Sequence, residues 1–396
     1  MMPAKVIALH RGTPLPEPAR PAASPWQRVR RLLAIRVDNL GDVLMTTPAL
    51  AAAAESVPGL EITLLGNAGA GALAPHLPMV HEVITAKVPW VRHETGHAID
   101  EDQALVARLA ARRFDAAVIF TVCTQSALPA ALLCRLAGIP LRLAHVRENP
   151  YELLSDWAPE PDIDIATARH EVRRQLDLVA RVGWRTADER LRFGLLPADV
   201  ASIEHLLAAH DPQDAGRRLV AVHVGASAPS RRWPAERFGQ AADAIARRTG
   251  ARVVFTGSAD ETPLIDAARA AMRPEERARS LALAGALTLG ELGALLARAD
   301  LLLTNNSGPA HLAAALGTPV VDLYALTNPQ HTPWQVPARV LSHDVACRNC
   351  LRSRCPQGHQ LCLTGVPTRA AVDAAIDLLD SSSPATGTHP ISEALS

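Results

Sequence analysis

Leu301-Leu302-Leu303-Thr304-Asn305-Asn306-Ser307-Gly308-Pro309-Ala310-His311-Leu312-Ala313-Ala314-Ala315-Leu316 is an apolar run, a polar glycine-containing turn and an alanine- and leucine-rich segment in sequence. This order predicts a buried parallel strand that leads into the N-terminus of a helix. Backbone N–H groups at such a terminus, together with the helix dipole, favour an anion such as phosphate. Asn306, Ser307 and His311 would place polar side chains around that anion. From this stretch alone, an ordinary turn in which Ser307 caps the helix is the alternative.

Length and composition set the broad class. The chain has 396 residues, which favours two domains over one. Its 40 Lys and Arg residues balance 40 Asp and Glu residues, so the charge gives no reason to expect a nucleic-acid partner. No apolar run reaches the roughly 18–20 residues that span a bilayer. The first residues are rich in proline and lack the apolar core of a signal peptide. We therefore predict a cytoplasmic protein.

Short apolar runs alternate with helical patterns twice along the chain. In the first half, strands are expected near 31–37, 60–65, 115–120 and 140–144, and helices near 43–54, 101–112, 125–137 and 165–182. In the second half, strands are expected near 219–224, 252–256, 281–284, 301–305 and 319–323, and helices near 234–248, 261–272, 288–298 and 369–380. This alternation predicts an α/β protein with two doubly wound, mostly parallel sheets.

Proline- and glycine-containing segments that interrupt these helix and strand patterns predict the domain boundaries. We expect, in chain order, a disordered leader (1–27), an N-terminal domain (28–190), a linker with one helix (191–217), a C-terminal domain (218–345), a cysteine-rich loop (346–366), a final helix (367–381) and a disordered tail (382–396). The glycine-bearing turns follow strand ends, which is where open α/β sheets bind ligands.

Three segments carry a resemblance to a known family. They are Ile35-Arg36-Val37-Asp38-Asn39-Leu40-Gly41-Asp42-Val43-Leu44-Met45-Thr46-Thr47-Pro48-Ala49-Leu50, His223-Val224-Gly225-Ala226-Ser227-Ala228-Pro229-Ser230-Arg231-Arg232-Trp233-Pro234, and the 301–316 stretch continued to Tyr324. In this order they resemble the motifs of glycosyltransferase family 9, the heptosyltransferase type. The resemblance implies the GT-B fold, in which two Rossmann-like domains face a cleft. It also implies inverting, metal-independent transfer of a sugar, usually heptose from ADP-heptose, to the lipopolysaccharide core.

The first motif supplies the candidate base and acceptor-side residues. An inverting transfer needs one group to take the proton of the acceptor hydroxyl. Asp42 follows a glycine turn at a helix N-terminus, and the family's catalytic Asp falls at this position. Capping of the helix is its other reading, and Asp38 is the second candidate base. Asn39 and Gly41 would shape the turn, and Thr46 would contact the acceptor or lie on the helix.

The other two motifs supply the candidate donor site. Ser227 and Ser230 offer hydroxyls to a diphosphate, and Arg231 stands where the family usually carries Lys. Asn306, Ser307, Gly308 and His311 match the family's nucleotide-binding turn, except that many members have Asp where this chain has Asn306. An Asp would accept bonds from sugar hydroxyls as a charged group, so the donor contacts are expected to differ here. Gly257, Asp260 and Glu261 follow another strand and would reach the nucleoside.

Four cysteines lie close together near the end of the chain: Cys347, Cys350, Cys355 and Cys362. Four thiols in one loop predict a structural zinc site, or less readily an iron–sulfur cluster. Free thiols or a local disulfide are the alternatives. No cofactor is expected for catalysis itself. Arg348, Arg352 and Arg354 make the loop basic, which would suit a phosphorylated acceptor.

Two other functions stay open at this level. A nucleotide-sugar 2-epimerase shares the fold but would need further acidic catalytic residues, which the sequence does not reveal. A non-catalytic nucleotide-sugar binding protein is the other alternative. In the family the acceptor is a lipid-anchored glycan, so peripheral contact with the inner face of the cytoplasmic membrane is a further expectation. The oligomeric state is not predicted.

Overall fold

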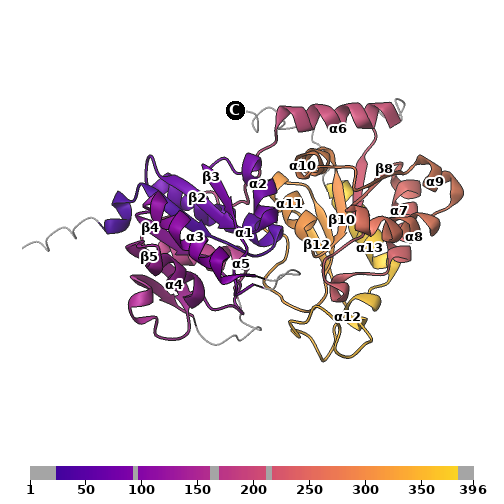
Figure 1. The fold of residues 1–396 in the computed structure, drawn as a ribbon. Coiled ribbons are helices and arrows are strands. Elements are labelled where there is room, and N and C mark those ends of the chain that lie inside the picture. The colour runs from indigo at the N-terminus through magenta and orange to yellow at the C-terminus, as the bar shows by residue number, and fades with distance from the viewer. Residues whose placement is uncertain (1–23, 92–96, 161–168, 211–215, 382–396) are drawn as a thin grey trace, which may run out of the picture.

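Two parallel six-stranded sheets, each covered by helices, make up the chain (Figure 1). The computed structural model describes residues 24–91, 97–160, 169–210 and 216–381. The predicted tail and most of the predicted leader lie outside these ranges. At the end of the predicted leader, Pro25–Arg28 form a 3-10 turn and Trp26 is 1% exposed, so residues 25–27 belong to the folded part of the chain. The Trp26 ring packs edge-on against Trp184, with 5.4 Å between ring centroids.

The first sheet has the strand order β3-β2-β1-β4-β5-β6. Its strands are β1 (Arg31–Ile35), β2 (Glu61–Gly66), β3 (Glu82–Thr85), β4 (Ala116–Ile119), β5 (Leu141–Val146) and β6 (Asp156–Pro159). Its helices are α1 (Leu40–Ser56), α2 (Ala68–Leu73), α3 (Ile99–Arg112), α4 (Leu128–Leu136) and α5 (Glu171–Ala180). Leu32 to Ile35 of β1 are all buried, as expected for a central parallel strand covered on both faces.

The second sheet has the order β12-β11-β10-β7-β8-β9. Its strands are β7 (Leu219–His223), β8 (Arg252–Gly257), β9 (Leu281–Ala284), β10 (Leu301–Asn305), β11 (Val320–Leu323) and β12 (Ala338–Leu341). Its helices are α7 (Ala235–Thr249), α8 (Thr262–Ala270), α9 (Pro274–Arg279), α10 (Leu289–Arg298), α11 (Gly308–Leu316), α12 (Leu361–Thr364) and α13 (Thr368–Ser381). The two doubly wound parallel sheets confirm the predicted fold class.

Contacts between the halves bring the two motif-bearing helices together. Helix α1 of the first half packs against α11 of the second, and Figure 1 shows the two side by side at the centre of the molecule. The segment between them in sequence contains α6 (Pro197–His210), which packs on α10 of the second half. Because each helix follows a strand of its own sheet, the carboxyl ends of β1 and β10 face each other across the junction.

Three strands were not predicted, namely β3, β6 and β12. Each lies at the edge of its sheet, and none has more than one buried residue. An edge strand is covered less completely than a central one, so it needs no continuous apolar run. These segments therefore lacked the pattern that identified the central strands.

Candidate active site

A cleft of about 620 Å³ lies between the halves, at the carboxyl ends of the central strands. Twelve of the residues singled out from the sequence line it: Asp38, Asn39, Gly41, Asp42, Ser227, Arg231, Glu261, Asn306, Ser307, Gly308, His311 and Arg352. They come from segments that are up to about 310 positions apart in sequence, and the facing sheets bring them together. The cleft therefore joins the predicted acceptor side to the predicted donor side.

Asp42 lies in the first turn of α1, where its two carboxylate oxygens have different partners. Oδ2 accepts a hydrogen bond from the backbone N–H of Asn39 at 3.2 Å, which is the helix-capping contact. Oδ1 lies 3.4 Å from Nη2 of Arg36. Asp42 is 8% exposed and lines the cleft. Its capping role and its availability to a ligand are therefore compatible.

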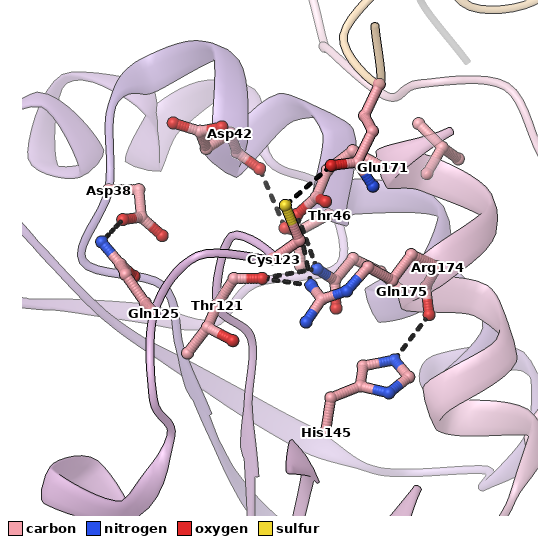
Figure 2. Close-up of polar contacts among 12 residues, drawn as sticks. Asp38, Asp42, Thr46, Thr121, Cys123, Gln125, His145, Glu171, Arg174 and Gln175 are labelled. Carbon is pink, nitrogen blue, oxygen red and sulfur yellow. Dashed lines mark hydrogen bonds and ion pairs between the residues drawn. The ribbon is translucent and has the colours of Figure 1, made fainter. Parts of the chain in front are cut away.

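Arg36 is the centre of a buried charge cluster under Asp42. Its guanidinium, fully buried at the end of β1, lies 3.1 Å from Asp38 and donates a 2.9 Å hydrogen bond to Glu171 of α5. Glu171 is also fully buried and accepts a hydrogen bond from Gln175. Figure 2 shows Glu171, Arg174 and Gln175 on one helix, with Asp42 and Thr121 opposite them. Helix α5 thus supplies the counter-charge that keeps Arg36 behind the candidate base.

The cluster sets the protonation behaviour of its carboxyl groups. Burial raises the pKa of Asp42, and the guanidiniums of Arg36 and, more weakly, Arg231 offset part of this effect. Burial also opposes ionisation of Glu171, but Arg36 and Arg174 outweigh it and lower the pKa of Glu171 to about 2. A carboxylate with a raised pKa is a stronger base than an exposed Asp. Asp42 is therefore the better base, while Glu171 stays ionised.

Asp38, the second candidate base, makes shorter contacts with its neighbours than Asp42 does. Its Oδ1 accepts a 2.8 Å hydrogen bond from Nε2 of Gln125, and its Oδ2 faces Arg36. Burial raises its pKa, and Arg36 counteracts this. Gln125 also lines the cleft and was not predicted as a site residue. Its signal in the sequence was its place shortly after a central strand.

The opposite wall of the cleft is built for a negatively charged group. Ser227 and Arg231 follow β7, and Ser307 and Gly308 begin α11. N–H groups in the first turn of a helix lack the usual partner four residues back, and the helix dipole adds partial positive charge there. In α11 this turn offers fewer donors than usual, because Pro309 has no N–H and the N–H of Ala310 donates to the carbonyl of Ser307 at 3.0 Å. Arg231 supplies a full charge. This wall can hold a phosphate or diphosphate in the way that the sequence predicted.

Glu261 joins the donor-side wall from the end of β8. Its Oε2 accepts a hydrogen bond from the N–H of Ser258 at 2.9 Å and lies 3.8 Å from Nε2 of His223. Gly225 is the reason that Glu261 fits, since a Cβ at that position would lie 1.7 Å from Oε1. Glu261 and His223 both line the cleft, whereas Asp260 does not.

Two neutral histidines stand near the junction. Burial lowers the pKa of His311 to about 3 and that of His331 to about 4. Both side chains line the cleft. His331 was not predicted, because it lies in an irregular segment beyond β11. At neutral pH neither ring adds positive charge, so the positive charge of the cleft lining on that side comes from Arg231 and Arg352.

Two predicted site residues lie elsewhere. Ser230 is 4% exposed, and its hydroxyl donates to the backbone carbonyl of Arg352 at 2.8 Å. Thr46 is fully buried and donates to the carbonyl of Asp42. Neither residue is among those that line the cleft. For Thr46, this agrees with the alternative that it lies on the helix, whereas the expectation that the Ser230 hydroxyl would bind a diphosphate is not met, because a backbone carbonyl accepts its hydrogen. Ser230 instead anchors the cysteine-rich loop, which contributes Leu351, Arg352 and Ser353 to the cleft wall.

The four clustered cysteines are free thiols in this structure. Within the described ranges, no three His, Cys, Asp or Glu side chains are gathered so that they could hold a metal ion. The Sγ atom of Cys347 lies 3.9 Å from Nε2 of His359. The zinc site is thus not formed in this arrangement and stays a prediction. Arg348 pairs with Asp344 at 2.7 Å and is not part of the cleft wall.

Replacing Gly41 by Ala is expected to lower kcat/KM by about 10- to 100-fold. A Cβ on Gly41 would lie 2.7 Å from Cδ2 of His311 in the other half, so the facing walls must shift. Misplacement of about 1 Å at reacting groups costs rate on this scale. Gly194→Ala is the control, because its Cβ would meet nothing closer than 3.7 Å. Steady-state kinetics on both variants check this, and equal rates would contradict it.

In the described part of the chain, no helix has both the length and the apolar character needed to cross a membrane.

A sequence model of glycosyltransferase family 9 (heptosyltransferase) matches residues 103–361. Lipopolysaccharide heptosyltransferase 2 of Salmonella typhimurium is 29% identical, over 76% of this chain and 85% of that protein. Lipopolysaccharide heptosyltransferase 1 of Pseudomonas aeruginosa is 26% identical, over 82% of this chain and 87% of its own length.

Solved structures show the same fold. The glycosyl transferase family 9 protein from Veillonella parvula aligns with a TM-score of 0.73 and 23% identity, covering 89% of this chain and 98% of that one. The E. coli ADP-heptose lps heptosyltransferase II aligns with a TM-score of 0.69 and 24% identity, covering 89% and 99%. The predicted GT-B fold is thereby confirmed. Because the family model covers more than half of the chain, this protein belongs to glycosyltransferase family 9 and is a glycosyltransferase.

Proposed function

We propose that the enzyme transfers heptose from ADP-heptose to a lipopolysaccharide core acceptor, with inversion at the anomeric carbon. The observation that carries this proposal is one cleft with a buried carboxylate, Asp42, on one wall and a cationic wall containing Arg231 opposite. Relatives named lipopolysaccharide heptosyltransferases support the donor and acceptor class. A solved E. coli heptosyltransferase with ADP-2-deoxy-2-fluoro heptose, related in fold, is consistent with that donor.

In this mechanism, Asp42 takes the proton of an acceptor hydroxyl as its oxygen attacks the anomeric carbon. The bond from that carbon to the diphosphate oxygen breaks, and ADP departs with the electron pair. Arg231, Ser227 and the N-terminus of α11 stabilise the negative charge that develops on the diphosphate. Because the base and the leaving-group site lie on opposite walls, the arrangement favours attack on the face opposite the departing ADP.

Arg231 replaced by Ala is expected to weaken ADP binding by about 10- to 100-fold. This loss of affinity corresponds to the roughly 1.5–3 kcal/mol that hydrogen bonds to a charged group contribute to the binding free energy. Calorimetry with ADP, UDP, GDP and CMP gives both affinity and selectivity, and Arg269→Ala, which lies on α8 and outside the cleft lining, is the control. Preference of the wild type for another nucleotide would remove ADP-heptose as donor. No nucleotide binding at all would contradict the proposed function.

We propose that transfer needs no metal ion, since Arg231 and the helix terminus serve the leaving group. Activity that survives dialysis against a chelator is the expected result, and loss of activity that Mg²⁺ or Zn²⁺ restores would overturn it. Metal analysis of the purified protein tests zinc at the cysteine-rich loop separately.

We further propose that the enzyme works peripherally at the inner face of the cytoplasmic membrane, where a lipid-anchored acceptor would lie. The basic residues Arg348 and Arg354 support this proposal, because exposed positive charge attracts anionic headgroups. The side chain of Arg348 is 55% exposed. Co-sedimentation with vesicles containing anionic lipid is expected to fall in Arg348→Gln/Arg354→Gln. Sedimentation that this double variant does not change would count against these arginines as the contact.

A further inference from the structure

The side-chain amide of Asn306 is held from behind by two acceptors. Nδ2 donates to the backbone carbonyl of His331 at 2.7 Å and to Oδ2 of Asp322 at 3.2 Å. A backbone carbonyl only accepts hydrogen bonds, so the nitrogen of Asn306 must face it. Both amide hydrogens are therefore used. The remaining polar atom of the side chain is Oδ1, which can only accept.

The carbonyl that orients the amide is itself fixed. The N–H of Gln330, one residue earlier, donates to Oδ1 of Asn328 at 2.9 Å, and its carbonyl accepts from the N–H of Glu171 at 3.0 Å. The N–H of His331 lies 3.4 Å from the hydroxyl of Tyr324. With this segment tied to both halves, the Asn306 amide has little freedom to flip.

The neighbouring Asn305 provides a comparison. Its Oδ1 accepts from the N–H of Trp233 at 2.9 Å, and its Nδ2 donates to the carbonyl of Val224 at 2.7 Å. Both ends of Asn305 are thus used inside the protein, as expected for a structural amide. Asn306 lines the cleft, and among the described residues no donor reaches its Oδ1.

The buried carboxyl group of Asp322 lowers the stability of the folded protein. It is fully buried on β11, and its Oδ1 has no hydrogen-bond partner among the described residues. Burial of a carboxyl group that is only partly satisfied opposes folding. Burial raises its pKa to about 7, which reflects the same cost. The contact with Asn306 is the one polar role that the described structure gives to the carboxyl group.

We propose that Asp322 is a positioning residue for the donor sugar. With the carbonyl of His331, it fixes Asn306 so that the cleft meets a neutral, acceptor-only oxygen. This inference rests on the proposed function, and it assigns the transferred group to neutral sugars that present a free hydroxyl at this point. The carboxylate of an anionic sugar, such as a uronic acid, can only accept hydrogen bonds. It would therefore find no donor in Oδ1 of Asn306, and the carboxyl group of Asp322 lies just beyond that amide, so such a sugar would be disfavoured.

The test compares ADP-heptose with ADP by calorimetry, without acceptor, because only the sugar meets Asn306. Asp322→Ala is expected to lower the affinity for ADP-heptose by about 3- to 10-fold, the size of one neutral hydrogen bond, and to change ADP affinity by less than about 2-fold. Asp322→Asn keeps an acceptor for Nδ2 and is expected to retain most of the sugar-dependent affinity. Thermal unfolding confirms that each variant is folded.

Asn306→Asp is the second, independent variant. Its carboxylate would face the His331 carbonyl and Asp322, so the proposal expects a loss of sugar-dependent affinity although a charged acceptor has been added. Retained or improved affinity would overturn the proposal, as would an Asp322→Ala variant that loses ADP and ADP-heptose equally. A wild type that transfers heptose but binds both ligands equally overturns this inference alone. Failure to bind ADP overturns the proposed function as well.

Discussion

Asp42→Asn is expected to reduce kcat by about 10²- to 10⁴-fold, the range for loss of a general base. The amide keeps an oxygen that can accept from the N–H of Asn39, so the cap of α1 is preserved. What is lost is the ability to take a proton. Initial rates of heptose transfer, with ADP affinity measured in parallel, separate this chemical effect from a binding effect.

Asp38→Asn is the matched control, because Asp38 also lines the cleft and faces Arg36. Its expected effect on kcat is the smaller of the two, since its oxygens are held at shorter distances than those of Asp42: 2.8 Å from Gln125 and 3.1 Å from Arg36, against 3.2 Å from Asn39 and 3.4 Å from Arg36. If Asp38→Asn abolished transfer while Asp42→Asn did not, the two assignments would have to be exchanged. Full activity in both variants would favour a protein that does not use either carboxylate as a base.

The pH dependence follows from the state of Asp42. The group acts as a base only when ionised, and burial raises its pKa above 3.8. The value of kcat/KM is therefore expected to be low at acid pH, where Asp42 is protonated, and to rise as the pH increases through that raised pKa. Arg36 lowers the pKa of Asp42, so removing Arg36 should move the acid limb of the profile to higher pH.

Arg36→Met is expected to destabilise the protein by about 3–5 kcal/mol, because it leaves buried carboxylates without their cation. For a domain of this size the melting temperature should fall by roughly 10 °C. Calorimetric or optical melting at several pH values measures this. An unchanged melting temperature would contradict the role of Arg36 at the centre of the cluster.

The sign of the pH effect on stability can be worked out from Glu171. Its pKa is lowered from 4.5 to about 2, so its stabilising contribution is complete above pH 4.5 and is lost as the pH falls toward 2. Arg36 provides much of that contribution. The deficit of Arg36→Met should therefore be larger at pH 7 than under acid conditions, where the carboxyl groups become protonated.

Arg174→Met is the control for the kinetic effect of Arg36→Met. Arg174 is as deeply buried and pairs with Glu160 and Glu171, but it makes no contact with Asp42. We expect this variant to lose stability as well, while the acid limb of its pH profile stays in place. A shifted limb in Arg174→Met would show that general loosening, and not the charge of Arg36, controls Asp42.

Much of the architecture was predictable because central parallel strands have a strong local pattern. Leu301 to Leu303 and Leu32 to Ile35 are buried on both faces, so each reads as a continuous apolar run followed by a turn and a helix. The turns and helix starts after these two strands carry Asn306 and Asp42, and the segment after the equally buried strand β7 carries Arg231. Residues at the carboxyl ends of central strands were therefore found from sequence, and the structure places them in one cleft.

Other site features have no local pattern. Glu171 lies on α5 about 130 positions after Arg36, and only the packing of α5 against α1 makes them partners. His331 comes from an irregular segment, and Gln125 gives no signal beyond its place after a strand. Ser230 and Thr46 looked suitable as ligands, but nearby carbonyls accept their hydroxyl hydrogens.

The sequence by itself determined the two-domain α/β class, the family motifs and most residues of the two walls, because periodicity and strand-end turns are local properties of the chain. Tertiary structure alone decided which charges share a buried environment, as Arg36 does with Glu171, and which way an amide faces, as Asn306 does between Asp322 and His331. Electrostatic and hydrogen-bond energies depend on distances between atoms and on burial. Those quantities exist only once distant segments have packed together.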